Sequence, residues 1–290
     1  MWFSFDVSDK TGTIPVKFWG RSDEAYVKRL FSSFDVNDVV SIKGGRIEPY
    51  QGNLEVNLSE GSCEIRKEID FDYADFAATA IKDIPKMISE FRDAVESVAD
   101  DDIRRLLKSI FEDDVLMKRY SESPAAKSYH HGYVGGLLEH SLSMIAMSRT
   151  VAKRHEPDLE LDLMVAGCML HDIGKIFQYE TKTVIDFTVE GGLLGHISMG
   201  AKMVEDKIDE LEGFPTELKN KVLHLILSHH GSHEAGSPVT PHFPEAVALH
   251  KIDDCDAQTK HAIQVKKRLL ETTDKAMSGA DRRFGFMYLK

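Results

Sequence analysis

The sequence predicts an α+β multidomain protein, in which a small β-rich N-terminal domain precedes a larger all-α domain. Three observations lead to this prediction. Apolar and polar side chains alternate with a period of two through the first seventy residues, which indicates strands. From about residue 73 onward, apolar side chains recur every three or four positions, which indicates amphipathic helices. The length of 290 residues also suits two domains of ordinary size.

Residues 1–63 are expected to form two hairpins with a short helix between them. FSFDVS and TIPVKFWG flank the turn DKTG, the helix covers residues 21–33, and VVSIKGGRIEPY and LEVNLS flank a turn at residues 51–53. The order strand–strand–helix–strand–strand predicts a truncated OB-fold β-barrel, because its first strand would have to precede Met1. Residues 64–73 are charged and have no clear period, so we expect a linker there.

Residues 74–290 are expected to form the helical domain. A helix pair, or one helix interrupted near Pro85, covers residues 74–98, and a small hairpin is expected over residues 179–189. The other predicted helices cover residues 102–111, 135–155, 161–173, 194–211, 216–230 and 244 to roughly 275.

Charge, cysteine and hydropathy restrict the possible functions. Lys and Arg number 36 against 48 Asp and Glu, so a net charge of −12 excludes binding of nucleic acid by bulk electrostatics. Cys63, Cys168 and Cys255 are odd in number and widely spaced, which predicts free thiols in a reducing cytoplasm. No apolar run approaches the roughly 18 residues needed to span a bilayer, and no signal peptide pattern is visible. We therefore expect a cytoplasmic protein.

Histidine is the unusual component of this sequence. All 13 histidines lie between His130 and His261, and five apolar segments carry a histidine or an aspartate. Burying unpaired imidazole and carboxylate groups is unfavourable, so several of them facing one core suggest a shared cation. Imidazole together with carboxylate suits zinc, manganese or iron better than calcium or magnesium. The candidate metal ligands are His140, His171, Asp172 and Asp253, with His196, His229 and His230 as ligands of a second ion or as phosphate contacts.

Chemical roles can be assigned to several of these residues. Asp172 is expected to orient the attacking water or to accept its proton. Lys175 follows it by one helical turn and is expected to stabilise charge on the phosphate, although it could instead be a lysine at a helix C-terminus. His130 and His131 are expected to contact substrate or to cap their loop. Asp254 remains a rival to Asp253 as the last ligand.

The N-terminal domain offers candidate base-stacking residues. Trp19 and Tyr50 are expected to bind substrate by stacking on bases, as exposed aromatic residues of OB-folds do. Phe3 and Phe5 fall on one face of their strand, which favours a core role.

The ordered set of histidines and aspartates resembles the HD-domain metal-dependent phosphohydrolase superfamily. The stretch HHGYVGGLLEHSLSM and the order of an OB-fold before an HD domain resemble, more narrowly, the YhaM-type 3′–5′ exoribonucleases. The resemblance implies His140, His171, Asp172 and Asp253 as metal ligands, with Asp253 preferred over Asp254 because KIDDCDA matches a D-x-x-D-A pattern. It also implies a catalytic His196, one or two divalent ions and a homo-oligomer. Mn²⁺ is the first expectation for the ion, with Zn²⁺, Fe²⁺ or Co²⁺ as alternatives.

The leading hypothesis is a metal-dependent phosphodiesterase that degrades single-stranded RNA, or single-stranded DNA, and releases nucleoside 5′-monophosphates. Its 3′–5′ direction is implied only by the resemblance. One alternative is a hydrolase of small nucleotides or cyclic dinucleotides, but GHIS stands where a GYP segment would be expected. A second is a non-catalytic nucleic-acid-binding or regulatory protein with a structural metal, which the full ligand set disfavours. A third is a two-iron oxygenase, which the OB-fold disfavours.

Overall fold

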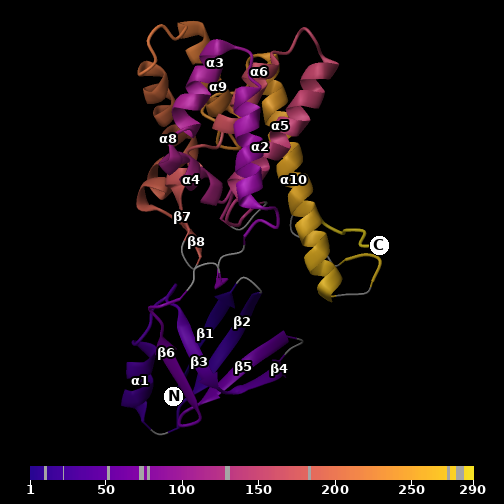
Figure 1. Ribbon diagram of the computed structural model, residues 1–290. Helices are drawn as coiled ribbons and strands as arrows, with labels where there is room; N and C mark the ends of the chain where they lie inside the picture. Colours follow the sequence, from indigo (N-terminus) through magenta and orange to yellow (C-terminus); the bar gives the residue numbers. More distant parts are fainter. Residues whose placement is uncertain are drawn as a thin grey trace. The chain divides into compact units, whose positions relative to one another are not determined.

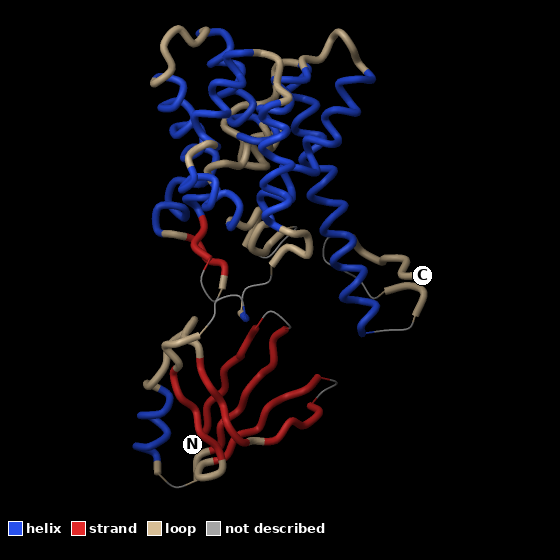
Figure 2. The backbone as a smooth tube through the Cα atoms, in the orientation of Figure 1, coloured by secondary structure: helices blue, strands red, loops and turns tan. Residues whose placement is uncertain are grey.

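The computed structural model describes residues 1–9, 12–21, 23–50, 53–71, 75–76, 79–127, 131–181, 184–272, 275–278 and 284–290. The chain divides into two compact units, residues 1–79 with 181–184, and residues 80–180 with 185–290. The first unit contains the strands β1 to β6, and the second contains the helices α2 to α10 (Figures 1 and 2). The predicted α+β class, with a β-rich part before a helical part, is thereby confirmed.

The N-terminal unit is built from two sheets. Strands β1, β2, β5 and β4 form a four-stranded sheet in that order, and β3 pairs with β6 in a second sheet. Neighbours β1 and β2 are antiparallel, β4 and β5 are antiparallel, and β2 and β5 are parallel. The elements are β1 (Trp2–Asp9), β2 (Gly12–Trp19), α1 (Glu24–Phe31), β3 (Val40–Gly44), β4 (Arg46–Tyr50), β5 (Asn53–Ser59) and β6 (Cys63–Lys67).

The core of the N-terminal unit follows from the alternation along its strands. Val16, Phe18 and Leu58 are fully buried, and Phe3 and Phe5 pack against them. Phe3 lies opposite Phe18 in the ladder between β1 and β2, and their rings are stacked with centroids 5.2 Å apart. The side chains of Phe3 and Phe5 therefore belong to the core, as their spacing predicts.

Two details of the N-terminal prediction require correction. The segment VVSIKGGRIEPY is not one strand, because it is divided at Gly44 and Gly45, where φ is 81° and 97°. A side chain at Gly44 would come within 2.4 Å of the carbonyl oxygen of Ser62. The proposed linker over residues 64–73 starts too early, because β6 extends to Lys67 and buries Ile65. The predicted turn residues 51 and 52 lie outside the described residues.

The helical unit contains the predicted helices, although the first begins only at Ile84, and two that the sequence did not reveal, α4 and α7. Pro85 lies in the first turn of α2, where its missing N–H is tolerated, so it starts this helix and does not interrupt it. The elements are α2 (Ile84–Glu96), α3 (Asp101–Phe111), α4 (Asp114–Glu122), α5 (Gly136–Arg154), α6 (Leu161–Leu170), α7 (Lys175–Gln178), β7 (Tyr179–Thr181), β8 (Ile185–Phe187), α8 (Val189–Asp209), α9 (Thr216–Ser228) and α10 (Pro244–Thr272).

Helix α6 lies in the centre of the helical unit. Every residue from Leu163 to Leu170 is buried, as expected of a helix that is apolar on all sides. It packs against α3, α5, α9 and α10, so the C-terminal end of α6 opens into the middle of the unit. Among the described residues, no helix is long and apolar enough to cross a membrane.

Candidate metal centre

Asp172 lies in the middle of a buried cluster of histidines, just beyond the end of α6. Its Oδ2 atom is 3.2 Å from Nε2 of His171 and 3.9 Å from Nε2 of His140. Its Oδ1 atom is 3.4 Å from Nε2 of His196 and 3.6 Å from Nε2 of His229. Each oxygen of this carboxylate therefore faces a different pair of imidazoles.

The first group of candidate ligands is formed by His140, His171 and Asp253. One ligand atom from each lies within 4.8 Å of the others, and Oδ1 of Asp253 is 3.2 Å from Nε2 of His140. Asp254, the rival candidate, is exposed and accepts a hydrogen bond from Gln258 on its own helix. The geometry therefore favours Asp253 as the last ligand.

The second group is formed by His196, His229 and His230, whose ligand atoms also lie within 4.8 Å of one another. His196 comes from α8, whereas His229 and His230 follow the end of α9. The ring centroids of His229 and His230 are 4.3 Å apart. Since Asp172 faces both groups, they could hold two cations that share its carboxylate.

Two glycines allow the loop that carries Asp172 to approach α8. A Cβ atom on Gly174 would lie 2.0 Å from the carbonyl oxygen of His196, so a larger residue would push the loop and the helix apart. Gly195 has φ of 72° and interrupts the helical geometry of α8 immediately before His196. These backbone features bring His196 beside Asp172.

Hydrogen bonds to the backbone orient three of the imidazoles. Nδ1 lies near a backbone carbonyl oxygen in His171 (3.2 Å), His229 (2.7 Å) and His230 (2.9 Å). A carbonyl oxygen can only accept, so Nδ1 carries the hydrogen in each ring. Nε2 of the neutral ring then carries the lone pair, which is the form that binds metal ions.

The buried polar atoms of the cluster fit a cation. Nε2 of His171, His196 and His229 and Oδ1 of Asp172 are buried and form no hydrogen bond within the described chain. Leaving such an atom unsatisfied costs about 1–3 kcal/mol, and one or two cations would satisfy all four. A divalent cation at this place would polarise a phosphoryl oxygen and lower the pKa of water to about 7.

The charge states of these groups also suit metal binding. Burial lowers the pKa of His196 to about 3 and lowers the pKa of His229 well below its ordinary value. Burial by itself would raise the pKa of Asp172, but Lys175 and His171 outweigh it and lower that pKa well below the usual range. At neutral pH the centre therefore presents the neutral imidazoles of His196 and His229 and the ionised carboxylate of Asp172. Burial alone would lower the pKa of His140, but Asp253 and Asp256 outweigh it and raise that pKa to about 9, so a cation bound by His140 would displace a proton.

Lys175 is close to the same carboxylate. Its Nζ atom is 2.5 Å from Oδ2 of Asp172, and its side chain is buried. Lys175 begins the four-residue helix α7, and its ammonium group pairs with the carboxylate of Asp172, which is the partner that the catalytic alternative needs. The ammonium group adds positive charge beside the carboxylate that faces both groups of candidate ligands.

The structure agrees with some of the predicted substrate-binding residues and not with others. His130 lies outside the described residues. His131 is only 2% exposed, and its Nε2 atom is 3.0 Å from Oδ2 of Asp256, so the predicted substrate contact of His131 is not supported. Trp19 and Tyr50 are 45% and 53% exposed, as base stacking would require.

Sequence reasoning did not identify two further residues of interest. Oδ2 of Asp256 is 2.7 Å from Nδ1 of His140; the spacing of three residues from Asp253 along one helix could have indicated its position. Trp2 is exposed, with its ring centroid 6.0 Å from that of Trp19. Alternation places it on the strand face opposite Phe3, which could have revealed it.

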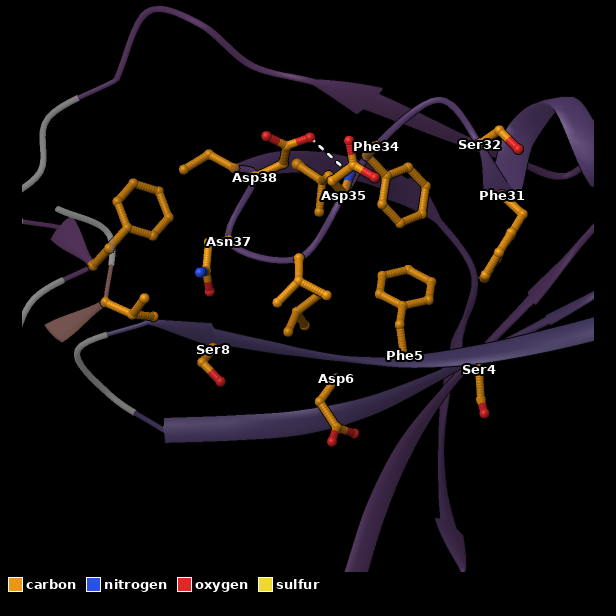
Figure 3. Close-up of a pocket in the computed structure, with 16 residues that line it drawn as sticks. Ser4, Phe5, Asp6, Ser8, Phe31, Ser32, Phe34, Asp35, Asn37 and Asp38 are labelled. Atoms are coloured by element: carbon orange, nitrogen blue, oxygen red, sulfur yellow. Dashed lines mark hydrogen bonds between the residues drawn. The ribbon is translucent and has the colours of Figure 1, made fainter. Parts of the chain in front are cut away.

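A pocket of about 730 Å³ in the N-terminal unit has different chemistry. Phe5 and Phe34 face each other in it, with ring centroids 5.1 Å apart (Figure 3). Asp6, Asp35 and Asp38 also line it, and none of its described lining residues is basic. An apolar pocket bordered by carboxylates is not suited to phosphate, so we do not assign a nucleic-acid-binding role to it.

Comparisons with known proteins agree with this architecture. Residues 137–258 match the HD domain family, and residues 1–63 match the OB-fold nucleic acid binding domain family. The chain is 32% identical to the 3'-5' exoribonuclease YhaM of Shouchella clausii over 283 residues, which is 96% of this chain and 84% of that protein. It is 31% identical to the 3'-5' exoribonuclease YhaM of Listeria monocytogenes serotype 4b, over 91% of this chain and 81% of that protein. No solved structure gives a significant match.

These matches cover both structural units and the residues of the candidate centre from His140 to Asp253. An HD domain with convergent histidines and aspartates is the mark of a metal-dependent hydrolase. The chain belongs to the family of HD-domain hydrolases with an N-terminal OB-fold whose curated members include the proteins named 3'-5' exoribonuclease YhaM.

Proposed function

We propose that this protein is a metal-dependent 3′–5′ exoribonuclease that shortens single-stranded RNA and releases nucleoside 5′-monophosphates. The observation that carries the proposal is the position of the Asp172 carboxylate between the two groups of candidate ligands. Its Oδ2 atom faces His171 of the first group, and its Oδ1 atom faces His196 and His229 of the second. Relatives that match 96% and 91% of the chain bear the name of that activity. The predicted Mn²⁺ remains our proposal for the ion, with one cation in each histidine group.

The reaction would break one P–O bond at the 3′ end. Water attacks the phosphorus of the terminal nucleotide, the bond to the 3′ oxygen of the preceding nucleotide breaks, and that oxygen takes a proton. Asp172 and His196 lie together at the centre and would orient the attacking water. Lys175 would stabilise the charge that builds on the non-bridging oxygens.

The direction of cleavage can be tested with two RNAs that differ only at the 3′ end. Single-stranded RNA labelled at its 5′ end is incubated with Mn²⁺, once with a free 3′ hydroxyl and once with a 3′ block. We expect a ladder of shortened labelled products, and release of nucleoside 5′-monophosphates, from the free RNA alone. Equal degradation of both RNAs would contradict the proposed direction, and intact RNA in both samples would contradict the ribonuclease activity. Single-stranded DNA of the same sequence tests the choice of sugar.

Lys175→Ala should lower turnover about 100-fold, which is the usual effect of removing one donor that stabilises transition-state charge. The Michaelis constant should change little, because the contact strengthens as the reaction proceeds. Steady-state kinetics on a short RNA measures both constants, with Lys175→Arg as the control that keeps the charge. A change confined to the Michaelis constant would make Lys175 a docking residue.

One face of the N-terminal sheet offers a surface for the bases of a longer RNA. Nζ of Lys17 lies 4.3 Å from the centre of the Tyr50 ring, and Trp19 donates a hydrogen bond from Nε1 to Asn57. Lys17 also forms an ion pair of 2.7 Å with Glu55, which reduces its attraction for phosphate. Stacking would therefore contribute more to binding here than charge.

Trp19→Ala should weaken the binding of single-stranded RNA about tenfold, since stacking contributes about 1–3 kcal/mol per base. Fluorescence anisotropy with labelled RNA, in Ca²⁺ to prevent cleavage, measures the dissociation constant. Phe31→Leu is the matched control, because Phe31 is exposed in the same unit but lies on α1 and not on the sheet. Equal affinities of the wild type and the Trp19 variant for RNA would contradict the proposal that this face of the sheet binds bases.

A further inference from the structure

A network of hydrogen bonds lies behind His140, on the side of the ring that faces away from Asp172. Nδ1 of His140 is 2.7 Å from Oδ2 of Asp256. Ser143 donates to the other oxygen of Asp256, and Nε2 of His131 is 3.0 Å from Oδ2. One carboxylate on α10 therefore accepts hydrogen bonds from three side chains.

The network continues from His131 toward the surface of the helical unit. Nδ1 of His131 is 3.0 Å from the hydroxyl of Tyr133, which donates to Oε2 of Glu139 at 2.6 Å. Nζ of Lys260 is 3.0 Å from Oε1 of Glu139. Since Lys260 follows Asp256 by one helical turn, the network ties α10 to α5 and to residues 131–133.

His140 differs from its neighbours in how its ring is fixed. His171, His229 and His230 each donate from Nδ1 to the backbone, whereas the acceptor for His140 is a side chain. An ionised carboxylate only accepts, so Nδ1 of His140 carries a hydrogen. Nε2, which faces Asp172 and Asp253, is then the atom of this ring that a cation would bind. A carboxylate partner also makes the imidazole a stronger ligand.

We propose that Asp256 is the positioning residue of the metal centre, and that it holds His140 in the orientation and the tautomer that bind a cation. His131 and Ser143 in turn hold Asp256. This inference rests on the proposed metal centre. His131, His140 and Asp256 could also be taken as a third group of ligands, but contacts of 2.7 and 3.0 Å are hydrogen-bond distances. Both imidazoles are therefore hydrogen-bonded directly to Asp256.

The test compares the Mn²⁺ affinity of Asp256→Ala and Asp256→Asn with that of the wild type. Affinity is measured without RNA, by competition with a fluorescent chelator. The alanine variant should bind Mn²⁺ 10–100-fold more weakly, as loss of such a partner does in other metal sites. The asparagine variant should lie between it and the wild type, because its amide oxygen still accepts from Nδ1 but carries no charge. Saturating Mn²⁺ should restore most of the activity of both.

Asp254→Asn is the matched control, because Asp254 lies on the same helix but is exposed and bonded to Gln258. Its Mn²⁺ affinity should equal that of the wild type. The absorption spectrum of bound Co²⁺ gives a second readout, which should change in the Asp256 variants alone. If the alanine variant does not fold, as judged by circular dichroism in chelator, the asparagine variant carries the test.

Unchanged Mn²⁺ affinity in the Asp256 variants would overturn the inference. So would the loss of one bound ion at all Mn²⁺ concentrations, because Asp256 would then be a ligand itself. A protein that binds Mn²⁺ as expected but leaves RNA intact would contradict the proposed function and not this inference. The two failures are therefore distinguishable.

Discussion

Asp172→Asn should reduce the rate of RNA hydrolysis about a thousandfold or more. A catalytic cation stabilises the transition state by several kcal/mol, and each loss of about 1.4 kcal/mol slows the reaction tenfold. Both oxygens of Asp172 face imidazoles, at 3.2 Å on one side and 3.4 Å on the other. An amide keeps the shape of the side chain but offers one weaker ligand atom and no charge. Bound metal should therefore fall together with turnover, and both are measured on the same protein preparation.

The fold of this variant should survive the change. Helix α6 and its neighbours form a continuous apolar core that does not depend on a cation, so the helical circular dichroism should remain near that of the wild type. Asp254→Asn removes the same charge at an exposed position and should keep full activity. Full metal content and full activity in the Asp172 variant would show that the centre is assigned wrongly.

Removing the cations with a chelator should abolish hydrolysis, and adding Mn²⁺ should restore it. The chain should remain folded meanwhile, because Lys175 lies 2.5 Å from Asp172 and partly balances its charge. The measurement is RNA cleavage before chelation, after it and after addition of Mn²⁺, with circular dichroism at each stage. Zn²⁺, Fe²⁺ and Co²⁺, added separately, rank the alternative ions. Cleavage that continues in excess chelator would contradict a metal-dependent reaction.

Much of the candidate centre could be predicted from the sequence because its residues interrupt apolar helices. A histidine within a segment such as GGLLEHSL must be buried, and a buried polar group needs a partner. The structure brings together all seven proposed ligands, which are the three residues of each group and Asp172 between them. The resemblance, and not the spacing, was needed to prefer Asp253 over Asp254.

Other features depend on contacts that no local pattern encodes. His131 and Asp256 are 125 residues apart, and only the packing of α10 against α5 brings them together. For this reason the sequence predicts a substrate contact or a loop cap for His131, whereas the structure buries it in the network behind His140. The sequence does not reveal the strand β6, because its residues are mostly charged and only Ile65 among them is buried. Helix α4 is nine residues long, too short for a clear period.

The most direct test of the account is the anomalous scattering of manganese in crystals of the wild-type protein grown with Mn²⁺. Two peaks are predicted in the helical unit. One should touch His140, His171, Asp172 and Asp253, and the other should touch Asp172, His196, His229 and His230. The account would be contradicted by the absence of any peak beside Asp172, or by a peak enclosed by His131, His140 and Asp256.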